Sequence, residues 1–340
     1  MNYDLMIDYL KQWGPDETFY RAYYLAKKSG QTLDNLIRNA SLDPAVICFA
    51  SDPSTIDPNK TERDFFNAGR NVSLVKHPRY LPFFEHKHAF FEMIYILNGH
   101  CQEVTRDRSM RLEEGDLCLL APGVTHGINV DDDSVILNIL IRTSTFMDIF
   151  LNTVRDKSQV SSFFLGNIYE KNRITYLIFH THGDTIIRNY ILDMYMEQMH
   201  LDDYSDRIIC SLLTIFLAQL TRLYGRTVEA ADSEKKQYPF SDEMLCYIHY
   251  HYRDVTLGTL AEHFHFSVPY CSKIIKEISG TSFSDLITRV RLQQAENMLI
   301  HTQMSVADIS ERIGYKNPET FIRAFQRVYS ISPSQYRKSV

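Results

Sequence analysis

The chain has 340 residues, of which 44% are hydrophobic and 23% are charged, as in ordinary folded globular domains. This length predicts two or three domains. The net charge of −6 argues against a protein that coats DNA through a strongly basic surface.

The chain contains no run of ~18 apolar residues, and it starts with acidic rather than basic residues. We therefore expect neither a membrane span nor a signal peptide. Six cysteines are scattered without a C-x-x-C pair, so a disulfide or zinc framework is not expected. These features together predict a cytoplasmic protein.

Residues 1–70 form an N-terminal extension that we expect to be mostly helical. Helical patterns cover residues 3–10, 18–26 and 33–39, and a loop rich in proline and aspartate follows at 51–60. The extension has three possible roles that the sequence leaves open: capping the next domain, extending a dimer interface, or touching the C-terminal domain.

Residues 71–183 alternate short β-rich runs with turns. The runs are Phe90–Leu97, Leu117–Leu120, Val135–Ile141 and Tyr176–Phe179. Glycines at 99, 115 and 123 and three aspartates at 131–133 mark the turns. Short strands at this spacing indicate an all-β sandwich or barrel.

Over residues 184–225 the spacing of apolar residues becomes typical of a helix, because they recur at three- and four-residue steps. The second half of this segment is apolar on more than one face. Such a helix either pairs with a second chain or packs only against its own barrel. The polar stretch 226–240, which ends near Pro239, is expected to be a linker.

Residues 241–340 contain two similar helical pairs about 50 residues apart. Thr256 and Ser267 are expected helix caps in the first pair, Ser305 and Asn317 in the second, and Gly314 breaks the chain between the second pair's helices. An amphipathic segment from about 282 to 300 joins them and would be ~27 Å long as a helix. Each pair alone is compatible with an ordinary αα-hairpin, but two copies in one register favour two helix-turn-helix units.

From Tyr238 to the end, 11 Lys and Arg residues oppose 10 Asp and Glu residues, which gives a net charge of +1. Non-specific attraction to phosphates should therefore be modest. We expect tight DNA binding to need a dimer or tandem half-sites.

The C-terminal part, roughly 242–338, carries a set of residues in a fixed order and spacing: Arg291, Ala295 and Leu299, then Val306, Ile309, Ile313, Gly314 and Tyr315, then Phe321 and Phe325, and finally Ser332, Pro333, Tyr336 and Arg337. With these residues it resembles the AraC/XylS family of bacterial transcription regulators. Ser330 departs from the pattern, because the family usually has glycine there. The resemblance implies double-stranded DNA as partner, contact with RNA polymerase, dimerisation through 184–225 and, most commonly, activation of transcription.

In the first expected recognition helix, Tyr270, Cys271, Ile274 and Ile275 form the core side, and Lys276 is among the outward residues. The resemblance places base contacts at Pro269, Ser272 and Lys273, and at Pro318, Glu319 and Arg323, with Thr320 near the DNA backbone. Lys273 and Arg323 hold equivalent places and suit guanine O6 and N7. The alternative is that both are solvated surface charges.

Within 71–183 the chain also resembles the two cupin motifs. His86, His88, Glu92 and Gly99 match the first motif, whereas Gly115, Pro122, Gly123 and His126 match the second with one residue too many before the proline. The resemblance implies a cupin-like barrel that senses a small molecule.

Three interpretations of the cupin-like residues remain open. His86, His88, Glu92 and His126 could hold Mn, Fe, Ni or Zn. The same residues, with Tyr95, could instead line an effector pocket that needs no cofactor, which is the interpretation we favour. The histidines could also be structural.

The sequence thus predicts a multidomain α+β protein: a cupin-like barrel with flanking helices, then an all-α domain of two helix-turn-helix units joined by a long helix. We expect a non-enzymatic, sequence-specific regulator, most commonly an activator in this family, controlled by an effector such as a sugar. The competing functions are a metal-dependent cupin enzyme with an accessory DNA-binding domain and an architectural DNA-binding protein.

Overall fold

The computed structural model describes residues 2–30, 70–106, 108–143, 175–200, 202–231 and 240–339, with short pieces between 37 and 66 and between 145 and 167. The chain divides into two compact units. The first holds the N-terminal helices, a β domain and two long helices that end before Glu229. The second holds the helices from residue 240 onward.

Two helices open the first unit, α1 (Tyr3–Lys11) and α2 (Pro15–Lys28). The side chain of Asn2 caps α1 by accepting a hydrogen bond from the backbone N–H of Asp4. These helices confirm the helical patterns at 3–10 and 18–26. The other expected features of the extension, at 33–39 and 51–60, lie largely outside the described residues.

The β domain consists of two main antiparallel sheets. The six-stranded sheet has the order β11-β10-β7-β4-β9-β2. Its strands are β2 (Val72–Lys76), β4 (Phe91–Asn98), β7 (Asp116–Leu120), β9 (Val135–Ile141), β10 (Tyr176–His180) and β11 (Glu229–Ala230). The three-stranded sheet has the order β6-β5-β8, with β5 (His100–Thr105), β6 (Ser109–Glu113) and β8 (His126–Asn129). A short parallel pair joins β1 (Asn59–Lys60) to β3 (Lys87–His88).

The four predicted strands are β4, β7, β9 and β10, each within one or two residues of its expected bounds. The glycine turns between them are also present. Gly115 has a φ of +86°, and a Cβ atom there would come within 2.1 Å of the backbone nitrogen of Gly183. Only glycine fits such a turn, because it accepts the left-handed region and carries no side chain.

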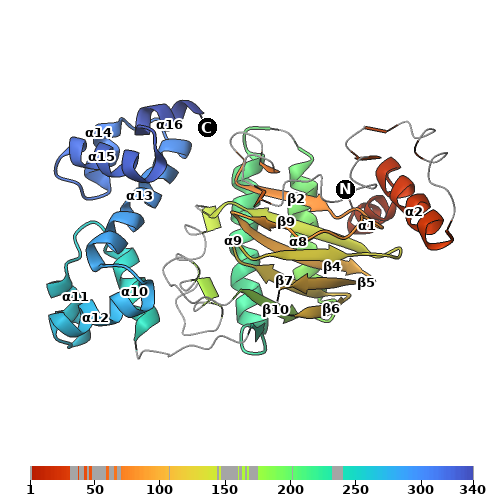
Figure 1. Ribbon diagram of the computed structural model, residues 1–340, viewed down its shortest axis with the longest axis horizontal. Helices are drawn as coiled ribbons and strands as arrows, with labels where there is room; N and C mark the ends of the chain where they lie inside the picture. Colours follow the sequence, from red (N-terminus) through yellow and green to blue (C-terminus); the bar gives the residue numbers. More distant parts are fainter. Residues whose placement is uncertain are drawn as a thin grey trace. The chain divides into compact units, whose positions relative to one another are not determined.

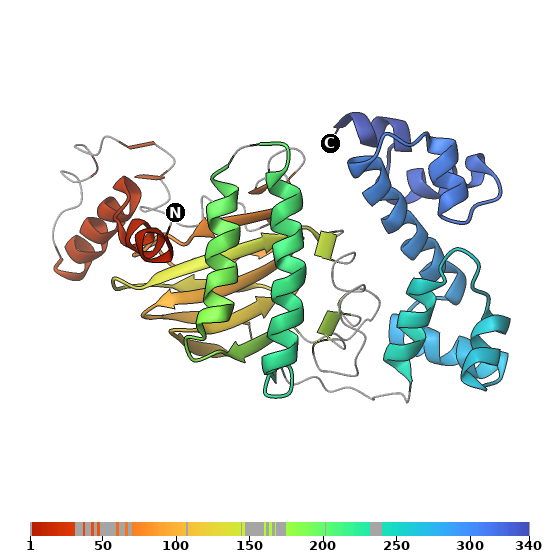
Figure 2. The ribbon, with the colours of Figure 1, turned by 180° about the vertical axis from the view of Figure 1, so that it is seen from behind.

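Helices α8 (Thr185–Gln198) and α9 (Ser205–Tyr224) lie side by side across one face of the six-stranded sheet (Figures 1 and 2). The first seven residues of β4 are all buried, since these helices cover one face and the three-stranded sheet packs on the other side. Among the described residues, α9 is also the one helix with the length and apolar composition of a membrane span, a property that core helices share.

From residue 240 onward, the described part of the second unit contains seven helices. They are α10 (Ser241–Tyr250), α11 (Leu257–Phe264), α12 (Val268–Ser279), α13 (Phe283–His301), α14 (Val306–Arg312), α15 (Pro318–Tyr329) and α16 (Pro333–Ser339). The predicted long connecting helix is α13, which joins the α10–α12 group to the α14–α16 group (Figure 1). All four expected caps accept backbone hydrogen bonds at the starts of α11, α12, α14 and α15.

The buried stripe of α12 differs in one residue from the prediction. Cys271, Ile274 and Ile275 are buried as expected, but Tyr270 is 39% exposed. Ile278 is buried instead. The buried face of α12 is therefore centred away from Tyr270, which lies at its edge. The Tyr270 ring packs edge-on against Phe266 at the margin of the unit.

Candidate functional site

Strand register shows which side chains enter the β domain. Residues directly opposite each other in an antiparallel pair share one face of the sheet. Asn138 lies opposite Ile94, two residues after Glu92, so Asn138 and Glu92 share a face. His77 extends the same ladder through a hydrogen bond from its N–H to the carbonyl of Ile136, which places it on that face as well.

The three-stranded sheet contributes to the same interior. Glu103 on β5 pairs with Ile128 on β8, and Thr105 pairs with His126. Glu103 and His126 therefore share one face of this sheet. His86 joins His126 through two backbone hydrogen bonds of 2.8 and 2.9 Å, just before the short strand β3.

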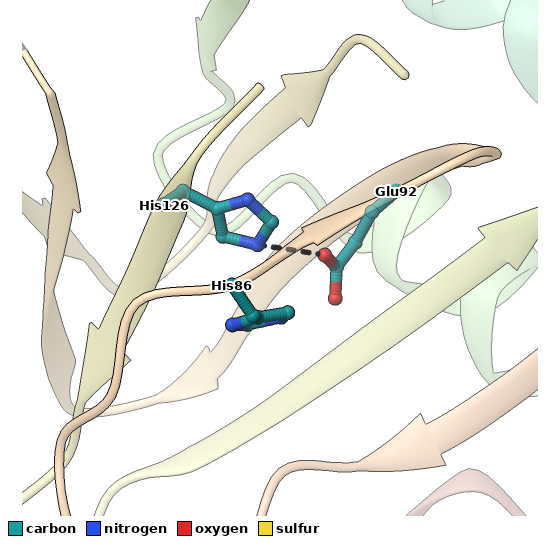
Figure 3. Close-up of side chains that lie close together, drawn as sticks. All are labelled: His86, Glu92 and His126. Carbon is teal, nitrogen blue, oxygen red and sulfur yellow. Dashed lines mark hydrogen bonds and ion pairs between the residues drawn. The ribbon is translucent and has the colours of Figure 1, made fainter. Parts of the chain in front are cut away.

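Glu92 is the centre of this group. One carboxylate oxygen lies 2.8 Å from Nε2 of His88 and 3.1 Å from Nε2 of His126, and the other accepts a 2.7 Å hydrogen bond from the amide of Asn138. Figure 3 shows His86, Glu92 and His126 converging from separate segments. Both glutamate oxygens are thus occupied within the described chain.

His88 is tied down on both sides of its ring. Its Nε2 faces Glu92, and its Nδ1 lies 2.7 Å from the carbonyl oxygen of Phe90. The ring also stacks on Phe90 with 4.2 Å between the ring centres. His88 is therefore held as a positioning partner of Glu92 and has no ring nitrogen left over for a ligand.

Several other buried polar atoms in this interior have no hydrogen-bond partner among the described residues. They are Nε2 of His77, Nδ1 of His86, both carboxyl oxygens of Glu103 and Oδ1 of Asn138. Glu103 is 0% exposed. Since buried polar groups in folded proteins are nearly always satisfied, their concentration here points to a site for a polar ligand.

The acid–base properties follow from burial and the central charge. Burial would raise the pKa of Glu92, but hydrogen bonds from His126 and His88 outweigh it and hold that pKa well below its ordinary value. Burial lowers the pKa of His77 and of His86 to about 4. Burial, together with the nearby charge of Glu92, raises the pKa of Glu103 well above its ordinary value.

Tyr95 does not belong to this group, contrary to the prediction. It is three residues after Glu92 on one strand, and an odd spacing places the two side chains on opposite faces. The pKa of Tyr95 is raised by burial, and the charges that act on it include Arg188 and Asp184, at the α8 side of the sheet. Tyr95 therefore packs beneath the helices and not in the interior.

Sequence reasoning missed three members of the interior: His77, Glu103 and Asn138. The signal for Glu103 was present, because alternation along β5 puts it on one face with Cys101 and Thr105, where a buried acid is unusual. His77 and Asn138 had no such local signal. They join the site through the pairing of β2, β4 and β9.

The geometry also bears on a metal. Ligand atoms of His86, Glu92 and His126 lie within 4.8 Å of one another. Two ligands at ~2.1 Å from one zinc are at most ~4.2 Å apart, so a metal fits only if these side chains close around it. His88, the fourth expected ligand, is outside this set because Glu92 and Phe90 hold its ring.

The N-terminal extension is bound to the β domain next to His77. Glu17 of α2 is buried and accepts hydrogen bonds from Arg79 at 3.0 and 2.8 Å and from Lys76 at 2.8 Å. The ring of Trp13 lies against the Arg79 guanidinium, 3.9 Å from its centre. These ion pairs hold the pKa of Glu17 at about 2, although burial opposes them.

The second unit exposes the predicted DNA-facing residues on α12 and α15. All eight are exposed: Pro269, Ser272, Lys273, Lys276, Pro318, Glu319, Thr320 and Arg323. On α15, Nε of Arg323 lies 3.4 Å from the carbonyl oxygen of Glu319, one turn earlier. Each helix thus presents a long cationic side chain in the equivalent place, Lys273 or Arg323, and a proline at its start, and each exposes a second cation, Lys276 or Arg327.

Comparison with known families gives two matches. A model described as a helix-turn-helix domain matches residues 260–339, and one described as an AraC-like ligand binding domain matches residues 76–183. The second match covers His77, His86, Glu92, Glu103 and Asn138. The first covers α12 and α15.

Some relatives match only part of this chain, and others match most of it. YtdP of Bacillus subtilis, described as an uncharacterized HTH-type transcriptional regulator, is 36% identical over 32% of this chain, but the match spans only 14% of YtdP. RhaS of Escherichia coli, described as an HTH-type transcriptional activator, is 23% identical over 81% of this chain and 95% of RhaS. Among solved structures, the C-terminal domain of AraT, a response regulator from Geobacillus stearothermophilus, is 33% identical, with a TM-score of 0.30, over 31% of this chain and 89% of that domain.

Proposed function

Because the chain belongs to the AraC/XylS family of DNA-binding transcription regulators and carries an AraC-like ligand-binding domain, we propose that it is an activator controlled by a small polar effector. The observation that carries the proposal is the set of buried, unpartnered polar atoms around Glu92 in a chain that also exposes two recognition helices. As a member of this family the chain is a regulator and not an enzyme.

We propose that α12 and α15 each enter the major groove. Lys273 and Arg323 would read guanines, while Ser272, Glu319 and the prolines at 269 and 318 contact neighbouring bases. Thr320 and Lys276 would contact the DNA backbone. Support comes from the exposure of all eight side chains and from the similar capping of both helices.

Selection of bound DNA from a random pool by the full chain tests this assignment. It should enrich two short motifs whose centres are about one helical turn, ~34 Å, apart. Enrichment of a single motif, or of none, would contradict readout by two units.

We propose that the protein acts as a homodimer through α8 and α9. The outer side of this helix pair exposes large apolar residues, among them Ile186, Met199, Ile208, Ile215 and Leu223. Ile208 and Ile215 are seven residues apart and so lie on the same side of α9. A dimer would also compensate for the +1 charge of residues 238–340, which limits the phosphate attraction of a single copy.

Sedimentation of the wild-type chain beside an Ile208→Asp, Ile215→Asp variant tests the dimer. The wild type should sediment as a dimer and the variant as a monomer. A monomeric wild type would contradict the proposal.

The effector itself is proposed to bind within the β domain, without a required metal. A cupin-like pocket of this kind suits a sugar or another small molecule rich in hydrogen-bond donors. Its binding would alter DNA affinity, and DNA would alter effector affinity by the same factor. Activation through RNA polymerase and a cytoplasmic location are further parts of this proposal, carried by the family membership.

A further inference from the structure

The strands of the β domain direct acidic side chains into the interior, but no lysine or arginine. On the described strands, the positions that share a face with Glu92 or Glu103 include histidines, Asn138, cysteines and aliphatic residues, but no lysine or arginine. Lys76 and Arg111 are at positions of the opposite face, where Lys76 binds Glu17 and Arg111 binds the exposed Glu113. A bound anion would therefore meet no lysine or arginine from these strands beside Glu92.

The unpartnered atoms are mainly acceptors of hydrogen bonds. Oδ1 of Asn138 is an acceptor, both oxygens of Glu103 accept once this carboxyl is ionised, and a neutral imidazole such as His77 or His86 has one accepting nitrogen. The complement of such a surface is a ligand rich in N–H or O–H donors. A positive group beside Glu103 would favour the ionised form of this carboxyl and would be attracted by it.

We propose that the ligand of this domain is a small polar molecule with an ammonium group, and that Glu103 is the residue that receives this group and selects its charge. The inference rests on the proposed effector function and narrows it to one class of ligand. Glu92 cannot take this role alone, because His88, His126 and Asn138 already occupy its oxygens. Glu103 is buried, and its carboxyl oxygens have no hydrogen-bond partner among the described residues.

A purely structural role would give Glu103 partners that stabilise the fold, as Arg79 and Lys76 do for Glu17. The stability of the ligand-free full chain separates the two roles. Glu103→Leu and Glu103→Gln should leave the midpoint of thermal unfolding unchanged or raise it, since they remove an unsatisfied buried acid. Glu17→Gln, the matched control, should lower it. A fall for both Glu103 variants as large as that for Glu17→Gln would overturn the proposal.

The class of ligand is tested with matched probes of different charge. The full chain is titrated with glucosamine, glucose and glucuronate, and separately with propylamine, 1-propanol and propionate, with thermal unfolding and calorimetry as readouts. In at least one series the amine should bind more tightly than its neutral and anionic counterparts. Glu103→Gln should weaken amine binding about 10- to 100-fold, the strength of a charge-assisted hydrogen bond, and abolish the preference.

Two results would overturn the ammonium assignment: tighter binding of a neutral or anionic member, or no binding of either amine at tens of millimolar. Either result leaves the proposed function intact if another compound binds the wild-type protein and changes the affinity of the protein for selected DNA. Failure of every bound compound to change DNA affinity would instead contradict effector control. The outcomes therefore separate the ligand class from the proposed function.

Discussion

The Glu92 carboxylate and Nε2 of His126 lie 3.1 Å apart and join the two sheets of the β domain. Glu92 belongs to β4 of the six-stranded sheet, whereas His126 begins β8 of the three-stranded sheet. Both side chains are buried. The contact therefore fixes the spacing of the sheets at the place where the unpartnered polar atoms gather.

Glu92→Gln should destabilise the protein by about 3–5 kcal/mol, the usual effect of removing one member of a buried charged network. The amide keeps the size of the side chain but no longer provides two accepting oxygens for His88, His126 and Asn138. Chemical denaturation of the full chain measures the change. Glu85→Gln is the control, because Glu85 is exposed and its loss should change the free energy of unfolding by less than ~0.5 kcal/mol. Equal effects of the two variants would show that the network is not stabilising.

Stability should fall as the pH drops from about 6.5 to about 4. The pKa values of His77 and His86 are lowered to about 4 in the folded chain, from an ordinary value of 6.5. The unfolded state therefore takes up protons first, and each histidine lowers the free energy of unfolding by up to ~1.4 kcal/mol per pH unit in this window. Glu92 has a lowered pKa and adds a further loss only below its ordinary value of 4.5, whereas Glu103, with its raised pKa, opposes the histidines above that value without cancelling them.

Denaturation curves between pH 8 and pH 4 check this dependence. His249 in the second unit also has a pKa lowered to about 4, so a His77→Gln, His86→Gln variant should flatten the slope but not remove it. An unchanged slope in that variant would contradict the assignment to the β domain.

Ser330→Gly should stabilise the second unit by up to ~1 kcal/mol. Ser330 ends α15 with a φ of 63°, in the left-handed region that favours glycine, and Gly280 ends α12 with a φ of 71°. The reciprocal change, Gly280→Ser, should destabilise by a similar amount. The thermal unfolding midpoint of each variant reports the sign, and a loss of stability in Ser330→Gly would refute the strain.

The purified protein should contain no stoichiometric Mn, Fe, Ni or Zn, because the polar groups fit an organic ligand and His86, Glu92 and His126 would have to close around an ion. Elemental analysis of the wild type beside a His86→Ala, His88→Ala variant is the check. One metal per wild-type chain that is lost in the variant would establish a metal site instead.

The DNA-binding helices could be predicted closely from sequence because their signals are local. Ser267 and Asn317 cap α12 and α15 at the expected residues, and Ser330, which departs from the family pattern, does end α15 in the left-handed region. The prediction that Tyr270 is buried was wrong. Tyr270 lies at the edge of the apolar face of α12, and the apolar pattern does not show whether a residue at that edge is covered.

The proposed ligand site was only half predictable. His86, Glu92 and His126 come from two short motifs and do converge, but Tyr95 was assigned without the strand alternation that separates it from Glu92. His77 and Asn138 depend on strand pairing across the sheet. The ion pair of Glu17 with Arg79 joins residues 62 positions apart, with no sequence pattern to reveal it.

The central claim is that the chain reads specific DNA through Lys273 and Arg323. The most direct measurement is the affinity of the full chain, Lys273→Ala and Arg323→Ala for DNA selected by the wild type, at a fixed salt concentration, beside DNA with the guanine of each half-site replaced. Each variant should lose about 1–3 kcal/mol of binding free energy on the selected DNA and lose the preference for guanine in its own half-site only. Unchanged affinity and unchanged sequence preference in both variants would contradict the account.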